Sequence, residues 1–321
     1  MKRYLFIIWA MMVAIVATGG ETPVRVGIAW QPTAASYDRV ILSIEQAGGE
    51  AVILPQLRPA GFDYEGMVLC PKYTDEMGVL HQQYADFVKR VTYHGTDADN
   101  LLAGVQAVVF LGGGVISSTL FAVPQPWHGI ADDSPANATR DVSEYLTMAY
   151  CLDHDIPVLG LCRGMQMLGV VSGAPLIQDL GDFFDEMGKN YHFLHRMQRD
   201  AEGKRYYTPH DVIVTDTTSL LYAIAGTGVI HDVPSWHHQV VGDVTGTPLR
   251  ITGVTPTDGV DIIEAIERTD KTFALGVQFH PEEAIKQHLK CHPGADRFMP
   301  LDEALKYFTA LICHTIKTTS Y

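Results

Sequence analysis

Positive charge is scarce in this sequence. The 321 residues include 23 Lys and Arg side chains against 37 Asp and Glu, which gives a formal net charge of -14. Nucleic acids and anionic membrane surfaces bind proteins through clustered Lys and Arg, and the chain has no basic run. We therefore expect neither as a partner, and solubility is a sufficient reason for the acidity.

Cysteine is also scarce, with five residues and no Cys-x-x-Cys pair, which excludes the usual redox and zinc signatures. His192 and His195 have a spacing that binds metals in some proteins, but the sequence shows no third ligand. We expect no metal and no other cofactor. An odd number of cysteines leaves at least one thiol unpaired in an exported protein. Four cysteines have no spacing typical of a disulfide framework, and buried thiols are the default for them: Cys70, Cys151, Cys291 and Cys313.

Long hydrophobic runs are confined to the N-terminus. Two basic residues precede the apolar run Tyr4–Val16, and small residues follow it at Ala17–Gly19. This order is typical of a secretory signal peptide. It predicts a signal peptide over residues 1–20 and an exported protein, periplasmic or extracellular, without stable membrane insertion after cleavage. The run is short for a spanning helix, and an uncleaved anchor is the alternative.

The first half of the chain has the pattern of alternating strands and helices. Strands are predicted over Val24–Trp30, Ala51–Leu54 and Ala107–Leu111, and a helix capped by Ser36 lies between the first two. Such an order is typical of a parallel sheet with helices on both faces. The second half adds short strands between Gly-, Pro- and Asp-rich turns: Asp211–Thr215, Gly228–His231, Leu249–Thr252 and Asp261–Glu267.

We therefore predict an α/β fold with an open, mostly parallel central sheet, helices on both faces and added short antiparallel strands. Residues 21–321 form a single domain with an insertion at about 57–103. A helical stripe from Met77 to Val91 lies in that insertion. A helix packed on the domain is the favoured interpretation, and a lid or pocket wall is the alternative.

A cysteine follows the most strongly apolar segment of the chain. Ile156–Leu161 reads as a buried strand, and Cys162 then lies between Gly160 and Gly164 before a helical run. This is the layout of a nucleophile elbow with Cys in place of Ser. Glycines on either side allow close backbone approach, and the helix N-terminus favours the thiolate. The N–H of Arg163 would face a developing oxyanion. The competing interpretation is a buried, inert cysteine.

Two further stretches carry groups that a cysteine nucleophile requires. The glycine cluster Gly112–Gly114 ends a strand, and Gly114 or Gly113 would supply a second oxyanion donor, with a plain tight turn as the alternative. His280 arrives at the end of the strand-like run Ala274–Phe279, and Glu282 follows two residues later. A base takes the proton of a nucleophile, and a carboxylate fixes the tautomer of that base.

These segments together resemble the class I glutamine amidotransferase-like superfamily. PVLGLCRGMQ is similar to its cysteine elbow, and GVQFHPE to its His and Glu stretch. Four further pieces narrow the resemblance to the γ-glutamyl-γ-aminobutyrate hydrolase branch, the C26 peptidases: Gly48-Gly49 before VILP, the helix with Arg140, Asp141 and Glu144, the SWHHQ cluster at 235–239, and DGVDIIEAIE at 258–267.

The resemblance implies hydrolysis of γ-glutamyl amide or peptide bonds of a small-molecule substrate through a γ-glutamyl thioester. It implies Cys162 as nucleophile, His280 as base and then acid, and Glu282 as the orienting carboxylate. By position, the resemblance also implies that the N–H groups of Gly114 and Arg163 form the oxyanion hole. It implies that Gln166, with His238 or Gln239, binds the glutamyl group. A homodimer is compatible with this assignment.

Two other functions compete. One is a glutaminase-type amidotransferase subunit that passes ammonia to a partner synthase, which export disfavours because ATP-dependent partners are cytosolic. The other is a binding protein that has kept the fold without catalysis. Retention of Cys, His and Glu together disfavours it. For the SWHHQ cluster, a surface loop and a part of the substrate pocket both stay open.

Overall fold

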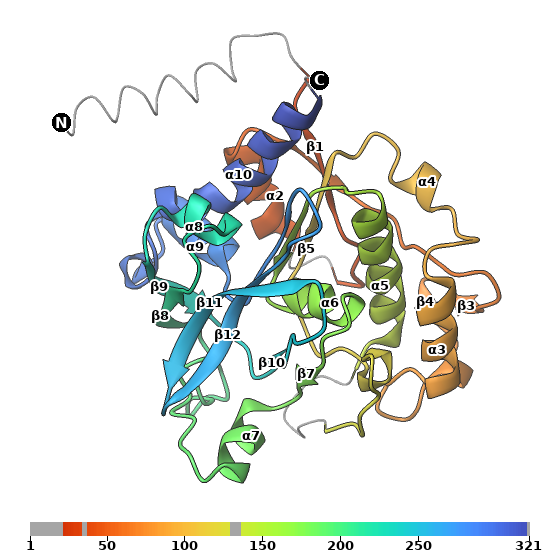
Figure 1. Cartoon of the computed structure of the whole chain (residues 1–321), viewed down its shortest axis with the longest axis horizontal. Helices are drawn as coiled ribbons and strands as arrows, with labels where there is room; N and C mark the ends of the chain where they lie inside the picture. The colour runs from red at the N-terminus through yellow and green to blue at the C-terminus, as the bar shows by residue number, and fades with distance from the viewer. Residues whose placement is uncertain (1–21, 34–36, 129–135, 320–321) are drawn as a thin grey trace.

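The computed structural model describes residues 22–33, 37–128 and 136–319. Its centre is a nine-stranded sheet in the order β2-β1-β5-β6-β13-β12-β11-β8-β9 (Figure 1). The predicted signal peptide and the predicted cap Ser36 lie outside the described residues. The strands of this sheet are β1 (Arg25–Ile28), β2 (Glu50–Ile53), β5 (Ala107–Phe110), β6 (Val158–Leu161), β8 (Thr208–Val214), β9 (Val229–Ser235), β11 (Leu249–Thr257), β12 (Val260–Arg268) and β13 (Ala274–Val277).

The sheet has a parallel half and an antiparallel half. Strands β2, β1, β5, β6 and β13 pair in parallel, while β12, β11, β8 and β9 continue the same sheet with antiparallel pairings. The predicted fold class is therefore confirmed, although the antiparallel strands are longer than predicted. Strand β11 runs through Gly253 and Pro256, because a register shift at Gly253 lets the pairing with β12 resume.

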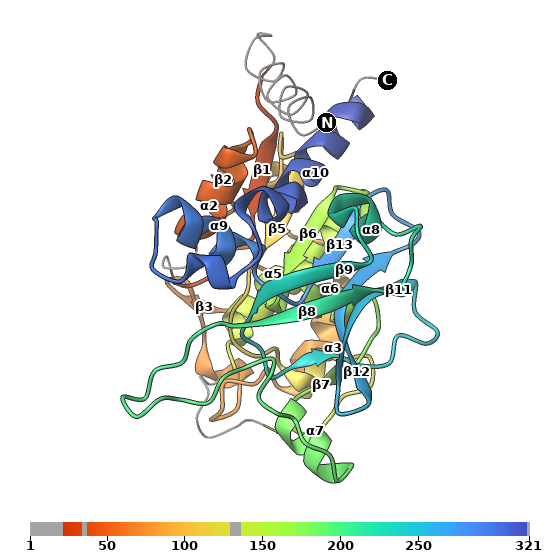
Figure 2. The same ribbon diagram turned by 90° about the vertical axis from the view of Figure 1, so that its left-hand side faces the viewer.

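Helices cover both faces of the sheet (Figures 1 and 2). The alternation along β5 explains this: Val108 and Phe110 join one hydrophobic cluster, and Ala107 and Val109 join the other. The first cluster contains residues of α5 (Ala138–Asp153) and α6 (Arg163–Val171). The second contains residues of α2 (Tyr37–Gln46), α8 (Leu220–Ala225), α9 (Pro281–Leu289) and α10 (Leu301–Thr319).

Residues 57–103 pack against the domain. They form β3 (Tyr64–Glu65), β4 (Val68–Leu69), α3 (Gln82–Val91) and α4 (Ala98–Leu101). The N–H of Leu69 donates to Thr139 Oγ1 on α5 at 3.0 Å, and Tyr150 of α5 donates to Asp99 at 2.8 Å. The predicted helical stripe was too long at its start, because Leu80 forms a β-bridge with Thr74 before α3 begins.

Small elements lie near the second half of the sheet: β7 (Leu176–Ile177), paired with β10 (Val240–Val241), and α7 (Leu180–Glu186).

None of the helices within the described ranges has the length and apolarity required to cross a membrane. All five cysteines are free thiols. Of the four cysteines for which buried thiols were expected, Cys151 is buried, Cys70 is partly buried, and Cys291 and Cys313 are exposed, so the expected burial was wrong for three of them.

The order of the strands positions the site. β6 lies between β5 and β13, and all three run in the same direction. The glycine loop after β5, Cys162 after β6 and His280 after β13 therefore reach the same edge of the sheet. Ligands of open α/β sheets bind at this carboxyl edge.

Candidate active site

Cys162 forms the turn between β6 and α6, as the sequence predicted. Its φ of +51° and ψ of -105° are rare for an L-residue and indicate a strained backbone. The adjacent glycines make the turn possible. A Cβ on Gly160 would lie 2.6 Å from the carbonyl of Gly164, and a Cβ on Gly164 would overlap the carbonyl oxygen of Phe110. The glycines are thus required for close packing of backbones, as in nucleophile elbows.

His280 and Glu282 lie beside Cys162. His280 precedes Pro281, where α9 begins, and its Nδ1 lies 2.7 Å from Glu282 Oε1. The other side of the ring hydrogen-bonds to Cys162. All three residues are at least 95% buried, with Cys162 exposed by only 4%. The structure therefore brings together the three residues for which catalytic roles were predicted.

The pKa of His280 is raised well above 6.5. Burial alone would lower it, but the charges that Tyr207, Glu282 and Cys162 contribute outweigh burial. The pKa of Glu282 is lowered, because the attraction of His280 and Arg39 outweighs its burial. An ionised Glu282 beside a protonated His280 is the charge state that these shifts favour at neutral pH. In this state His280 already holds the proton that a general acid must give to the leaving group.

The glycine loop lies against both His280 and Arg140. A Cβ on Gly112 would come within 2.6 Å of His280 Cε1, so this position has no room for a side chain. Arg140 Nη2 donates to the carbonyl oxygens of Leu111 at 3.2 Å and Gly112 at 3.0 Å. Gly114, predicted as an oxyanion donor, lines a hollow together with Cys162.

A network of buried ion pairs connects α5 to Arg163, the residue that follows Cys162. The side chain of Arg163 pairs with Asp141 and Glu144 of α5, and Arg140 Nε donates to Glu144 at 2.7 Å. Asp141 also accepts from the N–H and the hydroxyl of Ser117 at 2.9 and 2.6 Å. Burial lowers the pKa of Arg163 to about 9 and that of Arg140 to about 10, so both stay charged at neutral pH. The backbone of Arg163 starts α6, where helix N–H groups have no partner within the helix.

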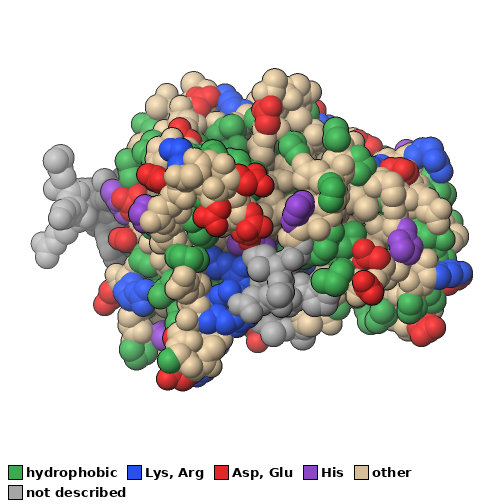
Figure 3. Space-filling model, turned by 90° about the horizontal axis from the view of Figure 1, so that it is seen from below, with side chains coloured by type: hydrophobic (Ala, Val, Ile, Leu, Met, Phe, Trp, Pro, Cys, Tyr) green, Lys and Arg blue, Asp and Glu red, His purple; other side chains and the backbone are tan. Residues whose placement is uncertain are grey.

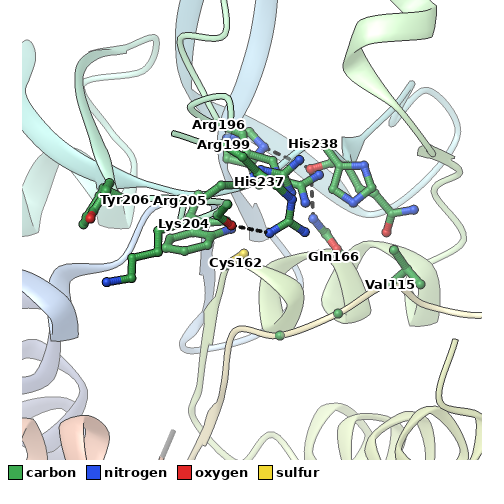
Figure 4. A pocket seen from close by; sticks show the side chains of 15 residues that line it. Val115, Cys162, Gln166, Arg196, Arg199, Lys204, Arg205, Tyr206, His237 and His238 are labelled. Carbon is green, nitrogen blue, oxygen red and sulfur yellow. Dashed lines mark hydrogen bonds between the residues drawn. The ribbon is translucent and has the colours of Figure 1, made fainter. Parts of the chain in front are cut away.

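A hollow of about 480 Å³ opens at Cys162 (Figure 4). Figure 4 shows Cys162 at the start of α6, Gln166 further along this helix, and Arg199, Arg205 and His237 above them. The three predicted substrate-binding residues also line it: Gln166, His238 and Gln239. The SWHHQ cluster therefore contributes to a pocket. A second hollow, of about 360 Å³, lies beside His280 and Glu282 and shares Cys162 and Trp236 with the first.

The predicted substrate-binding residues differ in their contacts. Gln166 Nε2 donates to the carbonyl of Gln239 at 2.9 Å and to Gln278 Oε1 at 3.2 Å. His238 Nδ1 lies 3.0 Å from Asp179 Oδ2. The side-chain oxygen of Gln239 is buried and has no hydrogen-bond partner among the described residues. Gln239 thus has a side-chain acceptor that no described residue uses.

Sequence reasoning missed four basic residues that line the first hollow: Arg196, Arg199, Lys204 and Arg205. They lie in the segment between α7 and β8, described from the sequence only as polar and aromatic. Their clustering within ten residues of an acidic chain was the signal that could have found them. On the face seen in Figure 3, Lys and Arg side chains gather in a group next to several Asp and Glu side chains.

Side chains of the types that bind metals also come together, in a group that the sequence did not show. His192 is exposed, but His195 is buried against His210, His237 and Glu264. The sequence concealed this group because its members are 15 to 69 positions from His195 and belong to different strands and loops. The pair His192 and His195 does not act together here, because only His195 belongs to the group.

Residues 84–282, more than half of the chain, match the peptidase C26 family. Over 186 residues the chain is 34% identical to a candidate glutamine amidotransferase of Mycobacterium tuberculosis, covering 58% of this chain and 53% of the relative. It is 30% identical to Protein NtpR of Enterococcus hirae, in a match that covers 56% of this chain and 67% of the relative. It is 29% identical to the γ-glutamyl-γ-aminobutyrate hydrolase PuuD of Escherichia coli, in a match that covers 47% of this chain and 56% of the relative.

The match to the first of these relatives thus spans only about half of its length. Among solved structures, a candidate GMP synthase component of Thermoplasma acidophilum superimposes with a TM-score of 0.50 at 12% identity, over 94% of this chain and all of that chain. At this identity the likeness shows the fold alone. The sequence matches thus include proteins named as a glutamine amidotransferase and as a γ-glutamyl hydrolase. The chain belongs to the peptidase C26 family.

Proposed function

We propose that the protein hydrolyses γ-glutamyl amide or peptide bonds through a γ-glutamyl thioester on Cys162. The observation that carries this proposal is the contact of Cys162 with His280, itself 2.7 Å from Glu282, at the floor of a hollow lined by basic residues. The name of the Escherichia coli relative supports the γ-glutamyl class.

The chemistry proceeds in two halves. Cys162 Sγ, whose proton has passed to His280, attacks the γ-carbonyl carbon, and the N–H groups of Arg163 and Gly114 stabilise the oxyanion that forms. When the intermediate collapses, the C–N bond breaks, the thioester remains, and His280 gives its proton to the leaving amine. His280 then takes a proton from water, the hydroxide attacks the thioester, and glutamate leaves as Cys162 is regenerated. Glu282 fixes the orientation of His280 in both halves.

The first hollow suits the glutamyl group. A γ-glutamyl substrate carries an α-carboxylate and an α-ammonium group. Arg199 and Arg205 line the hollow and provide positive charge for the carboxylate. The unpartnered oxygen of Gln239 provides an acceptor for the ammonium group. The second hollow, beside His280, is then the place of the leaving group, because His280 must protonate it.

The test is glutamate release from a panel of γ-glutamyl-GABA, γ-glutamyl dipeptides, folate polyglutamate and glutamine, without any partner protein. Turnover in the wild type and none in Cys162→Ala is the expected result, with Cys291→Ala, an exposed cysteine, as the matched control. The best substrate identifies the leaving group. No turnover with the whole panel, and no reaction of Cys162 with iodoacetamide, would contradict the proposal. Release from glutamine alone would favour the role of an ammonia donor to a synthase.

A further inference from the structure

Four buried side chains outside the triad converge on one point. His195 lies in the segment after α7, His210 on β8, His237 after β9 and Glu264 on β12. Glu264 Oε1 lies 2.9 Å from His195 Nδ1, 3.3 Å from His237 Nε2 and 3.6 Å from His210 Nε2. The four candidate ligand atoms all lie within 4.8 Å of one another. Each of the four residues is at most 6% exposed.

The outer hydrogen bonds fix the tautomer of His237. Its Nδ1 lies 3.0 Å from the carbonyl oxygen of Gln239, which can only accept, so Nδ1 carries a proton. In a neutral ring, Nε2 then presents a lone pair to the carboxylate of Glu264. Two acceptors face each other there without a hydrogen between them.

His210 is in the same situation. Its Nδ1 lies 3.2 Å from both the carbonyl oxygen of Asp211 and the hydroxyl of Thr255. That hydroxyl already donates to the Asp211 carbonyl at 2.7 Å, so Nδ1 of His210 must be the donor. Its Nε2 therefore also points a lone pair at Glu264, and within the described residues this atom has no hydrogen-bond partner.

All four side chains are removed from solvent, so no bulk water separates the carboxylate of Glu264 from the imidazole nitrogens. A buried carboxylate facing neutral imidazoles is costly unless a cation lies among them.

We propose that His195, His210, His237 and Glu264 bind one divalent transition-metal ion, with Zn²⁺ as the preferred ion. Imidazole and carboxylate are ligands of zinc, with bonds of about 2.0–2.2 Å that put ligand atoms roughly 3.3 Å apart in a tetrahedron. The contacts of Glu264 are close to that spacing. Metal-ligating histidines typically donate their other N–H to a carbonyl, as His210 and His237 do here.

The site is structural in character. Four protein ligands fill a tetrahedral ion and leave no open position for a substrate. The ion would connect β8, β12 and the segment after α7 to His237, which precedes His238 and Gln239 in the wall of the first hollow. It would thereby hold this wall in place. This inference rests on the ligand geometry and does not depend on the proposed γ-glutamyl activity.

The first experiment uses the wild-type protein alone. Metal is removed with a chelator, and Co²⁺ is added while the visible absorption is recorded and the ligands are identified by X-ray absorption. We expect one Co²⁺ per chain, tetrahedral ligand-field bands and an imidazole-rich ligand shell. Zn²⁺ should displace Co²⁺ and raise the thermal midpoint of unfolding. Absence of stoichiometric binding, or a shell without several imidazoles, would overturn the proposal whatever the variants do.

Variants then locate the ion. Glu264→Gln and His237→Gln should weaken Co²⁺ binding by at least about tenfold. His192→Ala is the matched control, because this exposed histidine belongs to the same short motif as His195 but lies outside the cluster. It should bind Co²⁺ like the wild type. Undiminished binding by a folded Glu264→Gln variant, checked by circular dichroism, would contradict the assignment.

Discussion

At the scale of single residues, the site depends on how Glu282 acts on His280. Glu282 lies 2.7 Å from His280 and raises the pKa of its imidazole against the effect of burial. A raised pKa contributes stability fully below about pH 6.5, the unfolded-state pKa of histidine, and this contribution is lost as pH rises through the folded-state value. The same titration is expected to define the alkaline limb of activity, where His280 can no longer donate its proton to the leaving amine.

The substitution Glu282→Gln tests this account. It keeps the size of the side chain and removes its charge, so the pKa of His280 falls. The alkaline limb of kcat/KM should move to lower pH, and kcat should fall by about 10²- to 10⁴-fold because the imidazole loses its orienting carboxylate. The measurement is a pH profile of glutamate release. An unchanged alkaline limb would show that Glu282 does not set the pKa of His280.

Gln239 offers a second prediction at this scale. Its buried oxygen has no partner among the described residues, although its backbone carbonyl accepts from Gln166. The variant Gln239→Met keeps that carbonyl and removes the side-chain acceptor. We expect KM to rise about tenfold with little change in kcat, which corresponds to one lost hydrogen bond of about 1.4 kcal/mol. Gln46→Met, at an exposed position of α2, is the control. A fall in kcat at constant KM would count against a binding role.

Residue types with a fixed spacing were predictable from the sequence. Cys162 between two glycines and His280 two residues before Glu282 are local patterns, and the parallel strands then brought them together. The basic residues of the first hollow and the group around Glu264 were not predictable in this way. Their positions depend on how a long segment folds back over the sheet, which no local spacing encodes.

At the scale of elements, the elbow rests on α5. The side chain of Arg163 pairs with Asp141 and Glu144 of α5, both inaccessible to solvent. The resemblance pointed to the acidic residues of this helix, but their pairing with Arg163 could not be read from the sequence. The partners are about 20 residues apart and meet only because α5 and α6 pack side by side.

Arg163→Met should therefore destabilise the fold strongly while leaving the backbone N–H of residue 163 in place. Two buried carboxylates would share the single remaining guanidinium of Arg140, and loss of one partner of a buried pair costs about 3–5 kcal/mol. The free energy of unfolding in urea gives this value. Arg25→Met is the matched control, since the side chains of Arg25 and its partner Glu50 are 38% and 47% exposed and the variant should lose about 1 kcal/mol or less. Equal effects of the two variants would contradict the importance of burial.

The length of strands was the weakest prediction at this scale. β11 continues past Gly253 and Pro256, two residue types that normally end a strand. Tertiary pairing with β12 on one side outweighs these local preferences, and the register shift at Gly253 accommodates them. The helix α3 shows the converse, because a β-bridge at Leu80 delays a helix that the apolar periodicity alone would start earlier.

At the scale of the whole molecule, we propose an exported protein that acts without a synthase partner. The proposal rests on the N-terminal pattern of Lys2 and Arg3 before the apolar run Tyr4–Val16. Expressed from its full sequence in a Gram-negative bacterium, the protein should accumulate in the periplasm without residues 1–20, as intact mass will show. A double variant, Ile7→Asp with Ile8→Asp, should remain in the cytoplasm at full length. Full-length wild type in the cytoplasm would contradict export.

The central claim is that Cys162 forms a γ-glutamyl thioester. The most direct measurement is mass spectrometry of the protein quenched in acid during turnover of the best γ-glutamyl substrate, followed by peptide mapping. The account predicts a γ-glutamyl adduct on the peptide containing Cys162. The adduct should be absent in Cys162→Ala and should decay when hydroxylamine is added. Turnover without any adduct, or an adduct on another cysteine such as Cys291, would contradict it.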